Sequence, residues 1–109
     1  MTVTLQPITQ DNWIECVQLN VTEDQQQRHF VASNAISLAQ ACWEPWWVPL
    51  GIYDSNTMVG FVMYGRRPGT NINYILRMMV DARYQGRGYG KAGLLAVIER
   101  IRREDSGEI

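Results

Sequence analysis

Three glycines at alternate positions, Gly86, Gly88 and Gly90, form the stretch of this 109-residue sequence best suited to chemistry. They follow a predicted strand that ends at Val80 and precede a predicted helix. The first N–H groups of a helix have no partner within it, and the helix dipole favours negative charge there. Glycine also lets the backbone approach a ligand closely and adopt a positive φ. The pattern therefore predicts a binding site for a phosphate or pyrophosphate.

Two familiar phosphate-binding patterns fit this loop poorly. A P-loop needs a glycine, four residues, and then Gly-Lys followed by Ser or Thr. Here Ala92 follows Gly90 and Lys91, and Gln85 stands where the first glycine should be. A dinucleotide fingerprint needs G-x-G-x-x-G after the first strand of a βαβ unit. These glycines are evenly spaced and follow a predicted antiparallel meander, which disfavours that reading as well.

The elements that must position the loop predict an α/β (α+β-like) fold with a mainly antiparallel sheet. Alternation and short apolar runs predict strands over residues 2–8, 50–54, 58–64 and 71–80. Helical spacing predicts two N-terminal helices, over residues 13–20 and 34–43, and a third helix after the glycine loop. The 58–64 strand is almost entirely apolar, so it should be covered on both faces.

Periodicity also predicts which side chains face the core. In the 71–80 strand, alternation places one set on a single face: Ile72, Tyr74, Leu76, Met78 and Val80. In the 34–43 helix, the predicted buried stripe is Ala35, Ile36, Leu38, Ala39 and Cys42. In the last helix, the predicted stripe is Leu94, Val97, Ile98 and Ile101. Trp13, Cys16 and Cys42 are also expected to be buried.

Composition excludes several classes of protein. Hydrophobic residues make up 46% of the chain and charged residues 19%, which favours one packed domain. The net charge of -1 disfavours a basic nucleic-acid binder. No apolar run approaches the roughly 20 residues of a membrane helix, and no secretory signal is visible, so we expect a cytoplasmic protein. Two cysteines and a single histidine, His29, lack metal-ligand spacing, so no metal site is expected.

The loop resembles a known cofactor signature. Gln85-x-x-Gly88-x-Gly90 after a strand is similar to the acetyl-CoA motif of the GNAT N-acetyltransferase superfamily. The resemblance covers essentially the whole chain and is closest to bacterial diamine and spermine/spermidine N-acetyltransferases. The segments that carry it are residues 30–40, 58–65, 77–81 and 84–91.

The resemblance implies transfer of an acetyl group from acetyl-CoA to a primary amine of a diamine or polyamine. It implies that an N–H near Met78 polarises the thioester carbonyl and stabilises the oxyanion. It also implies that backbone groups of Met78, Met79 and Val80 pair with the pantetheine arm. The pyrophosphate would be bound by the loop amides of Gln85, Gly86, Arg87, Gly88, Tyr89 and Gly90. Arg83, Arg87 and Lys91 either add charge near the phosphates or form a solvated basic surface.

The group that accepts the proton of the amine is harder to assign. An amine with a pKa near 10.4 must lose a proton before it attacks a thioester, and a carboxylate could take it. Leu76 and Arg77 stand where some relatives carry an acidic residue, which leaves the base unassigned. Glu44 is the best remaining candidate, because it lies among tryptophans that suit a cationic polyamine. The alternative is a surface glutamate beside core or interface tryptophans.

Members of the superfamily normally continue past the last predicted helix with further strands and a helix. We therefore expect residues 1–109 to be the N-terminal and cofactor-binding part of a single N-acetyltransferase domain. The strand at 71–80 would then form a sheet edge that invites a homo-oligomer. The alternative function is a truncated, non-catalytic fragment that binds CoA or only associates with itself.

Overall fold

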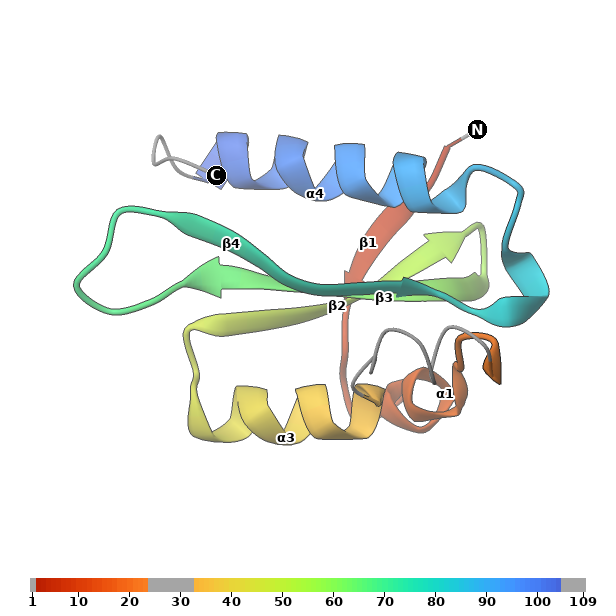
Figure 1. The fold of residues 1–109 in the computed structure, drawn as a ribbon, viewed down its shortest axis with the longest axis horizontal. Helices are drawn as coiled ribbons and strands as arrows, with labels where there is room; N and C mark the ends of the chain where they lie inside the picture. The colour runs from red at the N-terminus through yellow and green to blue at the C-terminus, as the bar shows by residue number, and fades with distance from the viewer. Residues whose placement is uncertain (1, 24–32, 105–109) are drawn as a thin grey trace.

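A single antiparallel sheet, in the order β1-β2-β3-β4, lies between α4 on one face and α1 with α3 on the other (Figure 1). The computed structural model describes residues 2–23 and 33–104. The strands are β1 (Thr4–Pro7), β2 (Trp47–Asp54), β3 (Thr57–Arg66) and β4 (Asn73–Val80). The helices are α1 (Trp13–Gln18), α3 (Asn34–Trp43) and α4 (Tyr89–Glu104), with a short 3₁₀ turn, η1 (Ala82–Tyr84), before α4. The predicted fold class and the predicted sheet are confirmed.

β2 begins three residues earlier than the sequence predicts, at Trp47, although Pro49 lies within it. A proline has no N–H to donate to a neighbouring strand. β1 pairs with β2 only as far as the Pro7–Leu50 pair, so Pro49 has no β1 residue beside it. Its other neighbour is Met63 of β3. The missing donor therefore costs the sheet little at this point.

β3 forms the centre of the core and, as predicted, is buried on both faces. Phe61 and Val62 follow one another and point to opposite sides of the sheet. Phe61 belongs to a cluster with residues of α1, and Val62 to a cluster with residues of α4. The first cluster also contains Cys16, Leu19, Trp47, Tyr53, Met58, Met63 and Met79. The second contains Leu50, Ile52, Val59, Tyr64, Tyr89, Val97 and Ile101.

The predicted buried stripe of α3 is only partly right. Leu38 packs against the core cluster, but the other predicted members are exposed, because the helix also turns polar residues toward the sheet. Asn34 and Ser37 are buried, whereas Ile36 is 59% exposed. The Asn34 amide donates to the Cys16 carbonyl at 2.9 Å. The Arg77 guanidinium of β4 donates to the Ser37 hydroxyl at 3.0 Å. Because these buried polar groups have partners, they can lie against the sheet beside Leu38, and the rest of the predicted apolar stripe faces outward.

Three further expectations about burial are corrected. Trp13 is 48% exposed and Leu94 is 40% exposed, and Cys42 is exposed while Cys16 is buried. For α4 the reason is close packing at Gly93, where an added Cβ would lie 2.8 Å from Ile52 Cδ1. The helix approaches the sheet through this glycine and turns Leu94 away from it. His29 and residues 30–32 of the 30–40 segment lie outside the described residues.

A β-bulge in β4 corrects the predicted alternation of that strand. Met63 pairs with Arg77 but Tyr64 pairs with Ile75, so β4 has one extra residue at Leu76. An extra residue reverses the facing of the side chains that follow it. Leu76 therefore packs against the α1 and α3 cluster, whereas Met78 packs against the α4 cluster.

Gly60 of β3 lies against the end of β4, so a substitution there tests how closely β3 and β4 approach each other. An added Cβ would lie 2.5 Å from the Met79 carbonyl oxygen. We expect Gly60→Ala to lower the free energy of unfolding by about 1–3 kcal/mol, measured by urea denaturation. Gly90→Ala is the control, because its Cβ would meet nothing closer than Val80 Cγ2 at 3.9 Å. A Gly60→Ala protein as stable as the wild type would contradict this close approach.

Candidate functional site

The glycine loop connects the end of β4 to the start of α4 through two residues with positive φ. Gly86 has a φ of 78° and Gly88 a φ of 89°, a region that other residues rarely adopt. The first backbone bond of α4 runs from the Ala92 N–H to the Gly88 carbonyl at 3.0 Å. The N–H groups of residues 89–91 precede that bond, so they have no acceptor within the helix. The loop therefore presents several donors at the positive end of a 16-residue helix.

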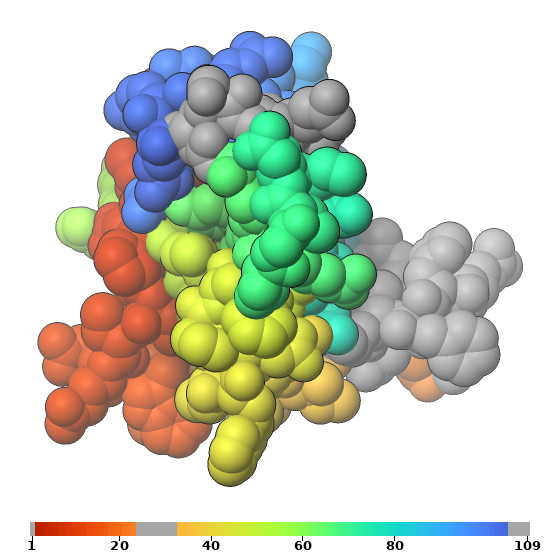
Figure 2. Space-filling model, turned by 90° about the vertical axis from the view of Figure 1, so that its left-hand side faces the viewer, coloured from red at the N-terminus to blue at the C-terminus, as the bar shows by residue number. Residues whose placement is uncertain are grey.

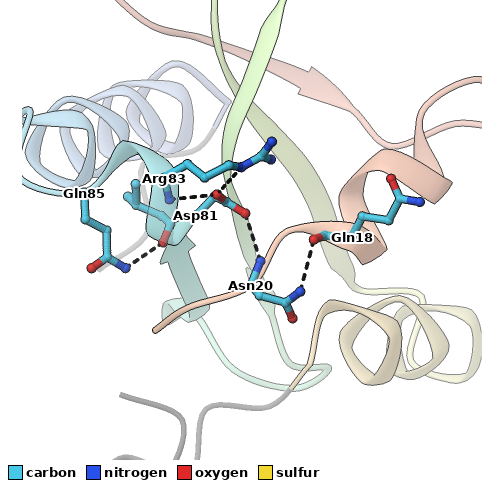
Figure 3. Close-up of polar contacts among 6 residues, drawn as sticks. Gln18, Asn20, Asp81, Arg83 and Gln85 are labelled. Atoms are coloured by element: carbon cyan, nitrogen blue, oxygen red, sulfur yellow. Dashed lines mark hydrogen bonds and ion pairs between the residues drawn. The ribbon is translucent and has the colours of Figure 1, made fainter. Parts of the chain in front are cut away.

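The buried carboxylate of Asp81 connects this loop to the segment after α1 (Figure 3). Asp81 is 4% exposed. It accepts hydrogen bonds from the Asn20 N–H at 3.0 Å, the Arg83 N–H at 3.0 Å and Arg83 Nε at 2.8 Å. In return, the Ala82 N–H donates to the Asn20 carbonyl at 2.8 Å. The Asn20 backbone is therefore attached to the end of β4 at two points.

The ionised form of Asp81 is favoured by this geometry. Burial raises the pKa of the carboxyl, but the bonds from Arg83 and from the Asn20 N–H together lower it below its ordinary value of 3.8. Hydrogen bonds to a carboxylate are stronger than those between neutral groups. Asp81 thus stays charged at neutral pH and holds the two segments together.

Met78 and Val80 direct their backbone groups to the free edge of β4. The Asp81 N–H donates to the Val59 carbonyl at 2.9 Å, and Val80 pairs with Gly60. In an antiparallel pair, residues alternate between bonding the neighbouring strand and pointing away from it. The groups of Met79 therefore face β3, while those of Met78 and Val80 point outward. Of the three residues predicted to pair with the pantetheine arm, Met78 and Val80 therefore have backbone groups on the free edge, whereas those of Met79 face β3.

The Gln85 side chain occupies part of this edge. Its amide donates to the outward-facing Val80 carbonyl at 2.9 Å (Figure 3). This bond satisfies the last carbonyl of β4 and fixes the direction in which the loop leaves the strand. The Val80 carbonyl is thus occupied. The outward backbone groups of Met78, which lines the cavity, have no described partner.

The free edge and the loop line an open cavity of about 410 Å³. Most of the residues predicted to bind the cofactor line it, namely Met78, Met79, Val80, Gln85, Gly86, Gly88, Tyr89 and Gly90. Val21 and Tyr84 line it as well, and the sequence analysis gave neither a role. Arg87 and Lys91 are exposed and do not belong to its lining. Their part in binding phosphate stays a prediction.

Two tyrosines stiffen the loop. Tyr89 is 8% exposed, and its hydroxyl donates to the Asp54 carboxylate at 2.5 Å. This bond, with burial, raises the pKa of Tyr89 above its ordinary value. The Tyr84 ring meets the Tyr89 ring edge-on, with 6.4 Å between centroids. The Arg83 and Arg87 guanidinium carbons lie 5.2 and 5.9 Å from the Tyr84 centroid, so cations gather on the loop.

Glu44 lies away from this cavity, at the C-terminal end of α3. Its carboxylate accepts hydrogen bonds from Trp47 Nε1 at 2.9 Å and from the Gln40 amide at 3.1 Å. The Trp47 bond, followed by the Gln40 bond, lowers the pKa of Glu44. A lower pKa makes a carboxylate a weaker base. The described contacts therefore give Glu44 the role of joining α3 to β2.

Sequence reasoning missed Asp81 as an organiser of the site. The signal was present, because an aspartate directly after a strand can cap the following turn. The Asp81 side chain does cap η1. The long-range bond to Asn20 had no such signal, since it joins residues 61 positions apart. Among residues 2–23 and 33–104, no group of three His, Cys, Asp or Glu side chains could hold a metal ion.

Comparison with known proteins places this chain in a family. The model of the Acetyltransferase (GNAT) family matches residues 5–109. The chain belongs to this family. It is 33% identical over 107 residues to a spermine/spermidine N(1)-acetyltransferase of Bacillus subtilis (strain 168). It is 32% identical to a probable spermine N(1)-acetyltransferase of Bacillus subtilis subsp. natto (strain BEST195). Both matches cover 93% of this chain and 69% of the relative.

A solved structure shares the fold of this N-acetyltransferase. It is the crystal structure of a GNAT family acetyltransferase from Staphylococcus aureus subsp. aureus USA300_TCH1516. The TM-score is 0.63 at 15% sequence identity, and the match covers 96% of this chain and 82% of that one. Within the described residues, no helix has the length and apolar character needed to cross a membrane.

Asp81 gives the acetyltransferase a pH-dependent stability. A carboxyl whose pKa is lowered by folding stabilises the protein above its unfolded pKa, and this contribution is lost as pH falls through the folded pKa. We expect Asp81→Asn to lower the free energy of unfolding at pH 7 by about 1–3 kcal/mol. The difference from the wild type should shrink below pH 3.8. Urea denaturation at pH 7 and at a pH below 3.8 measures this difference. Asp11→Asn, at an exposed carboxylate, is the control, and equal losses at the two pH values would contradict the role of the charge.

Proposed function

We propose that the chain binds acetyl-CoA and transfers its acetyl group to a primary amine of a diamine or polyamine. The observation that carries this proposal is the shared cavity, where the outward backbone of Met78 lies beside the N–H groups of the glycine loop. An extended pantetheine arm can pair with a strand edge, and a pyrophosphate suits a helix N-terminus. One cavity thus offers both kinds of contact that CoA needs.

The proposal gives each part of the site a role. The loop amides hold the pyrophosphate, and Arg83, Arg87 and Lys91 add positive charge around it. The Met78 N–H points at the thioester carbonyl, where a fixed donor stabilises the charge that develops on oxygen. Acetyl-CoA itself supplies the activated acyl group. The Asp81 carboxylate fixes the Asn20 backbone, and Val21, the next residue, lines the same cavity.

The proposed acceptor rests on the relatives, whose names identify spermine and spermidine as their substrates. The relatives are longer than this chain, which covers 69% of each. We propose that residues 1–109 are the cofactor-binding part of one such domain, in the cytoplasm. A second candidate is a non-catalytic CoA-binding or self-associating protein. It is favoured by β4, which ends the sheet within the described residues and could pair with a second copy.

Gly88→Glu tests the proposed cofactor loop. The new carboxylate would stand against phosphate, so we expect CoA affinity to fall about a hundredfold or more in calorimetric titration. Gly69→Glu is a matched control, because Gly69 has a similar positive φ of 82° and lies outside the cavity. It should retain the wild-type affinity while suffering similar backbone strain.

The same preparations test the reaction itself. With acetyl-CoA and spermine, spermidine or a diamine, the wild-type chain should release free CoA and Gly88→Glu should not. A wild-type chain that neither binds CoA nor releases it would overturn the proposal. CoA binding without turnover on any amine would favour the second candidate.

Glu44→Gln tests whether Glu44 is the general base or only joins α3 to β2. If Glu44 acted as the general base, the substitution would lower kcat by about 10²–10⁴-fold. Because its carboxylate is bound to Trp47 and Gln40, we expect kcat to stay within about threefold of the wild type and the acidic limb of the pH–rate profile to keep its shape. A hundredfold loss of kcat with unchanged CoA affinity would identify Glu44 as the base.

A further inference from the structure

Two arginines, Arg83 and Arg87, gather on one aromatic ring beside the glycine loop. Their guanidinium carbons lie 5.2 and 5.9 Å from the centroid of the Tyr84 ring. Tyr84 lines the cavity, whereas neither arginine belongs to its lining. Like charges that share one ring repel each other, and an anion that contacts both of them would remove that repulsion.

The described carboxylates compensate only part of this charge. Asp81 accepts a hydrogen bond from Arg83 Nε at 2.8 Å, so one edge of that guanidinium is occupied. The outer two nitrogens of Arg83 point away from the carboxylate (Figure 3), and the side chain is 67% exposed. Arg87 is exposed, and no carboxylate among residues 2–23 and 33–104 forms an ion pair with it. The rim of the cavity therefore carries donors that remain available to an anion.

Arg67 shows how an arginine of this chain stacks where no anion is needed. It lies in the turn between β3 and β4, at the left in Figure 1 and toward the viewer in Figure 2, at the opposite end of the sheet from the glycine loop. Its guanidinium carbon lies 5.7 Å from the Trp47 ring and 5.6 Å from the Tyr74 ring. After the bonds from Trp47 and Gln40, its charge also helps to lower the pKa of the Glu44 carboxyl. There a single cation has two rings and a carboxylate, whereas beside the loop two cations share one ring.

CoA carries two separate phosphate groups, a pyrophosphate within its chain and a phosphate monoester on the ribose 3′ position. A monoester has about 1.5 to 2 negative charges at pH 7 and three acceptor oxygens, which match the fork of a guanidinium. We propose that Arg83 and Arg87 together bind this 3′-phosphate, so that the chain distinguishes CoA from dephospho-CoA. The assignment rests on the proposed function and sharpens it, because it directs two of the loop cations to one phosphate.

The positions of the donors favour the monoester over the pyrophosphate. The pyrophosphate is continuous with the pantetheine arm, so it must follow the arm along the cavity lining, where Gly88, Tyr89 and Gly90 lie. The N–H groups at the start of α4 suit it there. The 3′-phosphate branches from the ribose and need not enter the cavity. Arg83 and Arg87 lie outside the lining but beside it, on the Tyr84 ring, which is a position that such a branch can reach.

Calorimetric titration with CoA and with dephospho-CoA tests the assignment. For the wild type, we expect dephospho-CoA to bind at least about tenfold more weakly, because it lacks the charged oxygens that the arginines bind. Arg87→Gln should weaken CoA binding about tenfold and leave dephospho-CoA binding within about twofold of the wild type. Arg83→Gln should reduce the preference for CoA in the same way. Because it also loses the Asp81 contact, which would weaken both ligands alike, the ratio of the two affinities is the measured quantity.

Arg67→Gln is the matched control, because it removes an exposed, stacked arginine from the other end of the sheet. It should keep the wild-type preference for CoA, and a loss of preference there would show that net charge alone sets it, against the assignment. Equal wild-type affinities for the two ligands, or a preference that survives Arg87→Gln, would overturn the assignment and leave the proposed CoA site standing. A wild type that binds neither ligand would overturn the assignment together with the proposed function.

Discussion

The buried carboxylate of Asp81 is the contact on which the candidate site depends. Removing a charge from water is costly, and the cost is offset here by hydrogen bonds from Arg83 and from the Asn20 N–H. Those bonds join three pieces of chain: the segment after α1, the end of β4, and the turn that leads to the glycine loop. Val21 follows Asn20 directly and lines the same cavity as Met78. The position of Val21 therefore depends on a carboxylate that is not itself part of the lining.

The pairing and the bulge of β4 also fix the position of the residues that line the cavity. Gly60 lets β3 approach the Met79 carbonyl, which holds the last residues of β4 in register. The bulge at Leu76 then reverses the facing of the strand. It directs Arg77 toward Ser37 of α3 and leaves Met78 against the α4 side. Without the extra residue, alternation would turn the Met78 side chain to the other face. The bulge at Leu76 lies before Met78–Val80 and the Asp81 hydrogen bonds lie after them, so both fix the position of these residues.

The sequence predicts those features that depend on local pattern. The loop glycines, the meander of β2, β3 and β4 and the length of α3 all follow from turn residues and periodicity. The facing of α3 does not, because an apolar stripe normally packs inward and here Arg77 and the Cys16 carbonyl satisfy the polar face. The bulge is set by pairing with β3, and the Asn20–Asp81 bond joins distant segments. Both depend on tertiary contacts that a single strand or loop does not encode.

The charges around the cavity suit one of the two substrates of the proposed reaction and not the other. None of the described residues that line it has a charged side chain, and the cations nearby, Arg83 and Arg87, stack on Tyr84. This environment suits an uncharged pantetheine arm with phosphates at its end. It offers nothing to a polycation, which needs carboxylates. Glu44 is already held by Trp47 and lies near Arg67 and Arg77. In the proposed reaction, the cavity would therefore hold the acetyl donor, and carboxylates outside its lining would recognise a polyamine, with only the reacting amine reaching the edge at Met78.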